Sequence, residues 1–222
     1  MSGSERQKRF HFPVWANYLL PGLLIAAAGG ALYVPVVAGL ALNAETLNTG
    51  YKPTQPVPFS HAQHVGQLGM DCRYCHTTVD SAAFAAVPPT STCINCHSPS
   101  NGVHQQSPNM VQVHESHATG MPIEWVKVHD LADHAHFNHA AHVNKGVGCV
   151  SCHGRIDQME VVEQVESLSM GWCLECHRAP EKHLRPREEV TTMDFTPEQL
   201  GMTQEELGMK LKEEYGIRSA TY

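Results

Sequence analysis

Residues 137–153 read FNHAAHVNKGVGCVSCH and contain two histidines three positions apart, His139 and His142, followed by a C-V-S-C-H motif at 149–153. Two thiols separated by two residues can form thioether bonds with the two vinyl groups of one haem. A histidine directly after the second thiol can then bind the haem iron as its proximal ligand. The second axial ligand must come from elsewhere in the chain, and His139 and His142 are candidates for it.

The same arrangement occurs a second time in FSHAQHVGQLGMDCRYCH, at residues 59–76. Both copies begin with Phe-x-His-x-x-His-Val, and each is followed by one further C-x-x-C-H motif, which gives two halves at about 59–100 and 137–180. A duplicated unit of this kind has to stack on its copy to bury enough surface. The predicted attachment sites are Cys72, Cys75, Cys93, Cys96, Cys149, Cys152, Cys173 and Cys176. The predicted proximal ligands are His76, His97, His153 and His177.

Zinc is the alternative interpretation of the cysteines, because the gaps between successive pairs also suit a C-x₂-C…C-x₂-C zinc ribbon. A zinc site of four cysteines has no use for the histidine that follows each pair. Paired redox disulfides are a further alternative, but they would need a βαβ context that the sequence does not show. All eight cysteines fall within the four motifs. We therefore expect four covalently bound c-type haems and no zinc.

The composition limits the classes of function and fold. A net charge of -7 over 222 residues, without a cluster of lysine or arginine, argues against nucleic acid as a partner. Hydrophobic residues are sparse after the first 45, which predicts a weak core for a soluble domain. Buried haem faces would complete such a core. We find no carboxylate pair, nucleophile–base pair or phosphate-binding loop, and we predict no catalytic residue.

The N-terminal region predicts a membrane anchor. No charged residue occurs from Phe12 to Ala44, and a helix of about 20 residues crosses a hydrocarbon core. We expect a cytoplasmic segment at 1–13, a transmembrane helix at 14–42 and a linker at 43–58. The cationic N-terminus would place the haem domain on the outer, periplasmic face of the inner membrane. A cleaved signal peptide is the alternative, although the apolar stretch is longer than a typical one.

The fold class predicted after the anchor is mostly α and irregular, with little sheet. Residues 59–186 should form the tetrahaem domain, with short helices that carry the motifs, joined by loops; we interpret residues 98–128 as an irregular connection. The tail at 187–222 contains two T-x-x-[QE] capping boxes, at Thr196 and Thr203. This tail is interpreted as a helix that docks a partner subunit, with a solvated terminal helix as the alternative.

Four irons need four distal ligands, and the duplicated Phe-x-His-x-x-His skeleton supplies four. A spacing of three places both histidines of a pair on one side of a helical turn, from which they can point to two different irons. The predicted distal ligands are His61, His64, His139 and His142. The reserve candidates are His129, His136 and His183, followed by the thioethers of Met70, Met121 and Met170.

The two halves resemble the small class III multihaem cytochromes c, in which two histidines bind each iron. The resemblance implies that the first histidine of a pair serves the next haem in the sequence and the second serves a later one. Exchange of ligands between the halves is an alternative. The implied pairs are His61 with His76, His64 with His97, His139 with His153, and His142 with His177.

Longer phrases resemble the multihaem cytochrome c subunit of alternative complex III, a bacterial membrane quinol oxidoreductase. They are PFSHAQHVGQLGMDCRYCH, VPPTSTCINCH, PIEWVKVHDL, FNHAAHVNKGVGCVSCHG and SMGWCLECHRAPEKHLRP, within residues 57–186. The resemblance implies an electron-transfer subunit beside an iron–sulfur subunit and integral membrane subunits that oxidise quinol, with a soluble cytochrome c or copper protein as acceptor. Members commonly hold five haems, whereas this chain has motifs for four, so one site has been lost or the electron route differs.

A membrane-anchored tetrahaem quinol dehydrogenase with its own quinol site is the alternative function. Such proteins also combine one anchor in the lipid bilayer with four haems. Their first haem motif follows the anchor closely, whereas 30 positions separate Leu42 from Cys72 here. The sequence therefore favours an electron-transfer subunit without substrate chemistry of its own.

Overall fold

The computed structural model describes residues 11–41 and 48–219. The chain divides into two compact units, an N-terminal unit at 1–46 and a haem-motif unit at 47–222. The expected cytoplasmic segment at 1–13 and the expected linker at 43–58 lie partly outside the described residues, at 1–10 and 43–47.

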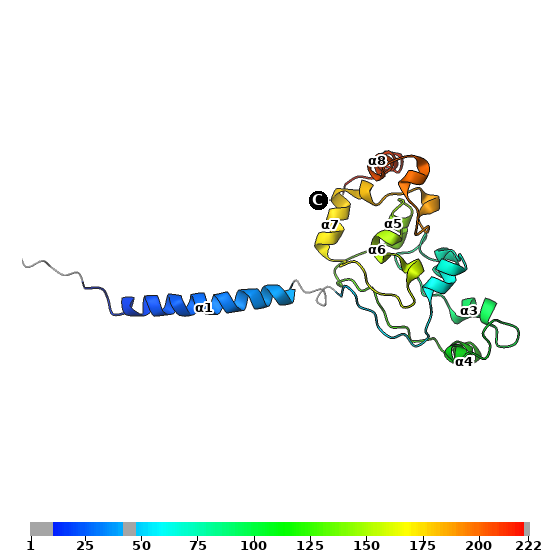
Figure 1. The fold of residues 1–222 in the computed structure, drawn as a ribbon, viewed down its shortest axis with the longest axis horizontal. Coiled ribbons are helices and arrows are strands. Elements are labelled where there is room, and N and C mark those ends of the chain that lie inside the picture. Colours follow the sequence, from blue (N-terminus) through cyan, green and yellow to red (C-terminus); the bar gives the residue numbers. More distant parts are fainter. Residues whose placement is uncertain (1–10, 42–47, 220–222) are drawn as a thin grey trace, which may run out of the picture. The chain divides into compact units, whose positions relative to one another are not determined.

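The N-terminal unit contains one helix, α1, which spans Ala16–Ala41 and is coloured blue in Figure 1. Its 26 residues correspond to a length of about 39 Å, enough for a hydrocarbon core of about 30 Å. No residue of α1 is buried within the chain, which distinguishes it from the core helix of a soluble protein. A signal sequence near the N-terminus can also meet this criterion of length and apolar composition.

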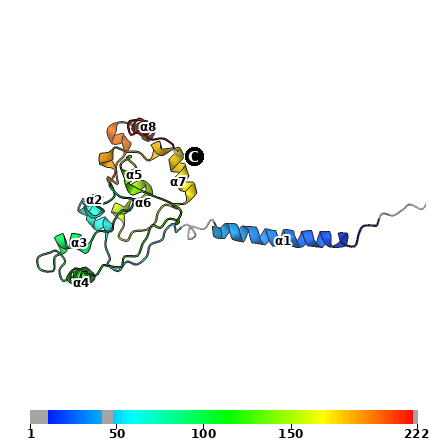
Figure 2. The ribbon, with the colours of Figure 1, turned by 180° about the vertical axis from the view of Figure 1, so that it is seen from behind.

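The haem-motif unit is built from short helices joined by loops (Figures 1 and 2). Between residues 48 and 219 there is no strand, and Val147 and Leu184 form one isolated antiparallel bridge. The prediction of a mostly helical and irregular fold is therefore confirmed. The α-helices are α2 (Cys72–Cys75), α3 (Thr90–His97), α4 (Val111–Thr119), α5 (His139–Val143), α6 (Val150–His153), α7 (Met170–Arg178) and α8 (Gln204–Glu214). The π-helix η2 spans Ala62–Gln67, and the 3₁₀ helices are η3 (Pro108–Met110), η4 (Ile156–Gln158), η5 (Pro180–Lys182), η6 (Arg187–Glu189) and η7 (Pro197–Leu200).

The two halves interlock through reciprocal backbone contacts. At the start of η2, the amide of Ala62 donates to the carbonyl of Met159, which follows the third motif, at 3.0 Å. At the start of α5, the amide of His139 donates to the carbonyl of Ala83, which follows the first motif, at 3.1 Å. Gly66 permits this close approach, because a Cβ there would lie 2.3 Å from the Asp157 carbonyl oxygen. Each pair of predicted distal histidines is thus positioned by the opposite half.

The C-terminal helix α8 packs on its own chain. The side chain and backbone of Thr203 form the predicted capping box with Glu206. Leu207 and Leu211 are buried beside Leu184 and Phe195. The apolar face of α8 is therefore occupied within this chain, and the partner subunit that we expect this helix to dock would have to contact its other face.

Two local expectations were wrong. The connection at 98–128 is not entirely irregular, because it contains α4, which ends at Gly120 with a φ of +72°. Its stability comes from packing beside α3 and from the buried side chains of Met110 and Val113, which lie against Val57. These two apolar positions are too few to reveal a helix by their spacing. The capping box predicted at Thr196 is absent, because the side chain of Thr196 makes no capping hydrogen bond.

The hydrophobic core is small. Only ten hydrophobic side chains of the described residues are buried, and most of them form two separate clusters. One cluster lies under α8, and the other lies between α3 and α4, at opposite ends of the unit in both ribbon views (Figures 1 and 2). The weak core predicted from the composition is confirmed.

Candidate haem-binding site

Each C-x-x-C-H motif lies on a short helix, as predicted: the four helices are α2, α3, α6 and α7. Side chains just before two of them satisfy free amides at the helix start. Asp71 accepts from the amide of Arg73 at 2.7 Å before α2, and Ser169 accepts from the amide of Trp172 at 3.3 Å before α7. The motif histidines follow at or near the helix ends, so each lies about one turn after its first cysteine.

One cavity of about 2520 Å³ brings the predicted residues together. All eight motif cysteines line it, as do the four proximal, four distal and three reserve histidines. A pocket for one small ligand measures roughly 300–1,000 Å³, so this cavity has room for several large ones. His104, His117 and His134 also line it, although their sequence context carries no repeat that would have identified them.

Three of the expected histidine pairs have similar ring separations. The ring centres lie 6.1 Å apart for His64 and His97, and 6.1 Å apart for His142 and His177. For His139 and His153 the separation is 6.5 Å. An imidazole bound to a first-row metal through a bond of roughly 2.0–2.1 Å has its ring centre about 3 Å from the metal, so two opposite ligands place their ring centres about 6 Å apart.

The fourth expected pair, His61 and His76, is close enough for a charge on His76 to affect His61. Burial, followed by the neighbouring His76, lowers the pKa of His61 to about 4. Burial, followed by the neighbouring His129 and His139, lowers the pKa of His153 to about 3. These imidazoles are neutral at pH 7, which is the form that binds a metal.

The phenylalanine of each repeat orients both histidines that follow it. Phe59 stacks on His64, with ring centres 4.3 Å apart and 26° between the planes, and contacts His61 edge-on at 4.8 Å. In the second half, Phe137 stacks on His142 at 4.5 Å and 28°. It contacts His139 edge-on at 4.7 Å. The duplicated sequence therefore gives a duplicated geometry.

Backbone carbonyls fix the second ring nitrogen of most of these histidines. The Nδ1 of His64 donates to the carbonyl of Ser60 at 2.8 Å, and the Nδ1 of His142 donates to the equivalent carbonyl of Asn138 at 2.8 Å. This leaves Nε2 with a lone pair for a metal. Similar bonds run from Nδ1 of His76 to Ala86 (2.9 Å), of His97 to Val103 (3.1 Å) and of His139 to Ala83 (2.9 Å). His61 differs, because its Nδ1 is buried without a hydrogen-bond partner in the described residues.

The reserve candidates have less suitable geometry. His129 lies edge-on to His153 with ring centres 4.5 Å apart, which is too short for two ligands on opposite sides of one iron. Its Nε2 is nevertheless buried without a partner among the described residues. His136 and His183 line the cavity but make no ring contact with a motif histidine within residues 48–219.

These observations fit covalently attached haem. The apolar cavity, the cysteine pairs on its wall and the facing imidazoles with free Nε2 atoms are the donor set that such a group requires. In the described part of the chain, no three side chains of His, Cys, Asp or Glu converge as a zinc site requires.

The first motifs of the two halves approach the same segment: the Cys149 amide donates to the Val190 carbonyl at 3.0 Å, and the Cys72 sulfur lies 4.0 Å from the Thr191 carbonyl oxygen. The neighbouring Cys149 thiol, together with burial, raises the pKa of Cys72. The neighbouring Cys72 thiol lowers the pKa of Cys149, and the Arg73 guanidinium lowers it further. The second cysteine of the same motif, Cys152, has its pKa raised to about 12 by burial.

Comparison with known proteins agrees with this site. Residues 39–123 match the model of the class III cytochrome C family. The chain is also 35% identical over 99 residues to the multihaem cytochrome c subunit of menaquinone reductase from Nitratidesulfovibrio vulgaris (strain Hildenborough). That match covers 45% of this chain and 45% of the relative, less than half of either. The mostly helical, strand-free unit with its four haem motifs therefore resembles a class III multihaem cytochrome c domain, and the family match covers residues 39–123 of the chain.

Proposed function

We propose that this chain is the electron-transfer subunit of a membrane quinol oxidoreductase of the alternative complex III type. It would hold four c-type haems, which supply reversible one-electron transfer when bound. The ring separations of about 6 Å between three motif histidines and histidines of the duplicated repeat carry this proposal.

The positions of the side chains support the proposed ligand set. The eight motif cysteines attach the haems, and His76, His97, His153 and His177 bind from one side. His61, His64, His139 and His142 bind the same four irons from the other side, in that order. His61 is assigned to the iron of His76 because His76 is the neighbour that, after burial, lowers the pKa of His61 most, and because the other three pairs use the remaining histidines.

Two imidazoles on every iron leave no position for a substrate. The residues of this chain would then serve to hold the haems, to keep their ligands neutral and to exclude water. Phe59 and Phe137 fix the ring planes, and the backbone carbonyls fix the proton on Nδ1. This arrangement supports electron transfer between haems rather than a reaction of a bound substrate.

The remaining parts of the proposal concern the membrane and the partners. Helix α1 would be retained as a single-pass anchor in the inner membrane, with the haem-motif unit on the periplasmic face. The relative from Nitratidesulfovibrio vulgaris is a subunit of menaquinone reductase, which supports a quinone-linked complex. We propose an iron–sulfur subunit and integral membrane subunits as the source of electrons, and a soluble cytochrome c or copper protein as the acceptor.

Purification from native membranes in mild detergent tests the proposal. The chain should stain for covalent haem, give four haems in a pyridine haemochrome assay and show the corresponding intact mass. Iron–sulfur and integral membrane subunits should co-purify with it. A chain that purifies alone and oxidises quinol would instead be a quinol dehydrogenase, and a mass with three or fewer haems would contradict the ligand set.

A further inference from the structure

We propose that Asp71, Arg73, Asp80 and Thr191 form a positioning network that sets the placement of the first haem motif of one half against the first haem motif of the other. The inference rests on the proposed function, because it assumes that both motifs carry haem. Arg73 occupies a variable position of the first C-x-x-C-H motif. None of the four residues is a cysteine or histidine of a motif, and none belongs to the predicted ligand set.

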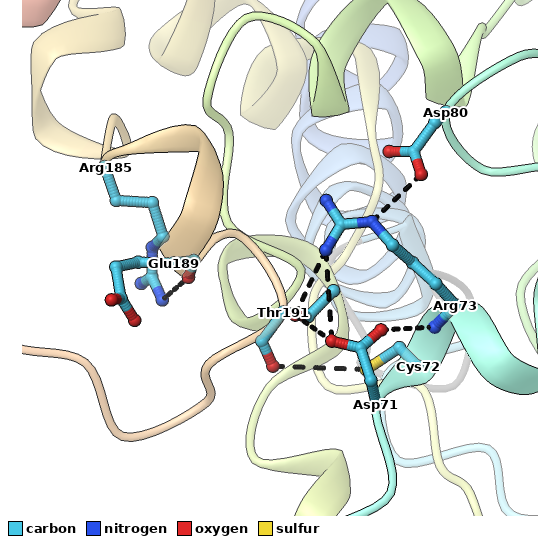
Figure 3. A network of polar contacts seen from close by, with 7 residues as sticks. All are labelled: Asp71, Cys72, Arg73, Asp80, Arg185, Glu189 and Thr191. Atoms are coloured by element: carbon cyan, nitrogen blue, oxygen red, sulfur yellow. Dashed lines mark hydrogen bonds and ion pairs between the residues drawn. The ribbon is translucent and has the colours of Figure 1, made fainter.

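The network begins on α2 and reaches the C-terminal segment (Figure 3). The Nε of Arg73 donates to the Asp80 carboxylate at 2.9 Å, and its Nη1 donates to the Thr191 hydroxyl at 3.3 Å. The Thr191 hydroxyl donates to the second oxygen of Asp71 at 2.7 Å. The first oxygen of Asp71 accepts from the Arg73 amide and caps α2. Thr191 is thus tied to the first motif, although 118 positions separate it from Arg73.

The same C-terminal segment also holds the second half. The carbonyl of Val190 accepts from the amide of Cys149 at 3.0 Å. Arg185 donates to the carbonyl of Thr192 at 2.7 Å and to that of Glu189 at 3.4 Å, which fixes the segment between them. Two successive residues therefore hold the two halves: Thr191 binds the first half, and Val190 binds the second half.

The two motifs held in this way are the two that approach this segment. Cys72 and Cys149 approach successive residues of this segment, Thr191 and Val190. Asn144 of the second half adds a further link, because its Nδ2 donates to the Asp80 carbonyl at 2.9 Å. A shift of the segment at 190–191 would change the separation of the motifs rather than the structure of either one.

The network survives haem attachment, whereas the contacts of the thiols do not. Formation of a thioether consumes the proton of Cys72, so its long contact with the Thr191 carbonyl, at 4.0 Å, cannot persist as a hydrogen bond. The four network residues bear no reacting atom. Arg73 and Asp80 are also partly exposed, at 34% and 42%, so their ion pair contributes little to stability and its role is mainly geometric.

The experiment compares Thr191→Val and Arg73→Gln with matched controls in the complete, membrane-purified protein. Thr196→Val makes the same change five positions later, at an exposed threonine that makes no capping bond. Thr191→Ser retains the hydroxyl, and Arg73→Lys retains the charge without the planar fork. Redox titration followed by electron paramagnetic resonance measures each haem. The variants His61→Ala and His139→Ala identify the signals of the haems at His76 and His153, because each variant should change the signal of one of these haems.

We expect Thr191→Val and Arg73→Gln to retain four low-spin haems but to shift the potentials of the haems at His76 and His153. The other two potentials should stay unchanged, Arg73→Lys should give a smaller shift, and Thr191→Ser and Thr196→Val should behave as the unchanged protein. Identical potentials in all variants, or equal shifts in all four haems, would overturn the inference while the proposed function stands. Absence of covalent haem from the unchanged protein would instead refute the proposed function.

Discussion

The imidazole rings of His139 and His153 lie almost parallel, with 11° between their planes and 6.5 Å between their centres. His139 comes from the repeat and His153 from the motif, and the Nδ1 of His139 is held by the carbonyl of Ala83 from the other half. A ligand fixed by a second hydrogen bond retains its orientation when the metal changes its oxidation state.

Replacing His139 with alanine should open one iron without releasing its haem, because the two thioethers and His153 remain. One haem in four should become high-spin and bind carbon monoxide or cyanide. Electron paramagnetic resonance and optical spectra of the purified variant measure this. His11→Ala, which changes a histidine outside the haem-motif unit, should leave all four haems low-spin.

The neighbouring His129 provides a sharper version of this test. Its Nε2 is buried without a partner in the described residues, beside His153. If the His139→Ala variant keeps four low-spin haems and the double variant His139→Ala/His129→Ala loses one, His129 has taken over as ligand. Four low-spin haems in both variants would mean that the assignment of His139 is wrong.

Replacing Phe137 with leucine should loosen both histidines that it contacts. An aromatic pair contributes about 0.5–1.5 kcal/mol beyond the area that it buries, so we expect a loss of stability of about 1–3 kcal/mol for the two contacts. Chemical denaturation of the holoprotein measures the loss. The spectra of the haems at His153 and His177 should broaden, whereas Phe59→Leu should affect the other two haems. Identical changes in all four haems for either variant would contradict this.

Replacing Gly208 with alanine should displace α8 from η5. A Cβ at this position would lie 1.9 Å from the carbonyl oxygen of Glu181, which is backbone and cannot move aside easily. Overpacking of this kind typically costs about 1–3 kcal/mol. Thermal unfolding should show a lower midpoint for Gly208→Ala. Gly171→Ala, whose added Cβ meets only a side-chain oxygen at 4.0 Å, should change the midpoint little, and equal midpoints for both variants would contradict the packing of α8.

Acid should displace His61 only well below the usual titration range of a histidine. The pKa of His61 falls from 6.5 to about 4 on folding, so the folded chain binds fewer protons than the unfolded chain between these values. The stability that is present above pH 6.5 is therefore lost as the pH falls toward 4. In an optical titration of the oxidised protein, the haem to which His61 is assigned should remain low-spin at pH 5. A change of this haem to high-spin centred near pH 6.5 would contradict this reasoning.

The N-terminus of the mature protein should be that of the uncleaved chain. The 26-residue apolar helix is longer than the 7–15 apolar residues of a typical signal peptide. N-terminal sequencing of protein extracted from membranes measures this directly. A mature start near Ala26 or Asn43 would contradict the retained anchor.

Much of the site could be predicted from local sequence, because its chemistry is encoded over short distances. The spacing of His139 and His142 and the preceding Phe137 determine one turn of helix and two ring orientations. The structure repeats the ring orientations around Phe59, although the turn there is a π-helix. The fold class followed from the abundance of loops and the weak core.

The contacts across the chain could not be predicted in the same way. Thr191 is bound to Arg73 over 118 positions, and neither residue lies in a pattern that indicates the other. Helix α4 forms because Val113 packs on distant residues rather than because of its own periodicity. These features depend on tertiary packing, which a single sequence does not display.

The reciprocal bonds between Ala62 and Met159 and between His139 and Ala83 have a consequence for biogenesis. If the chain is exported as proposed, its first half would emerge before the partner that positions its histidines exists. That half could not complete its own sites while the second half is still being translocated, and a fragment that ends near residue 100 should not mature into a stable dihaem protein. Haem attachment would act on an open chain, and the final closure of the domain would follow as one cooperative event.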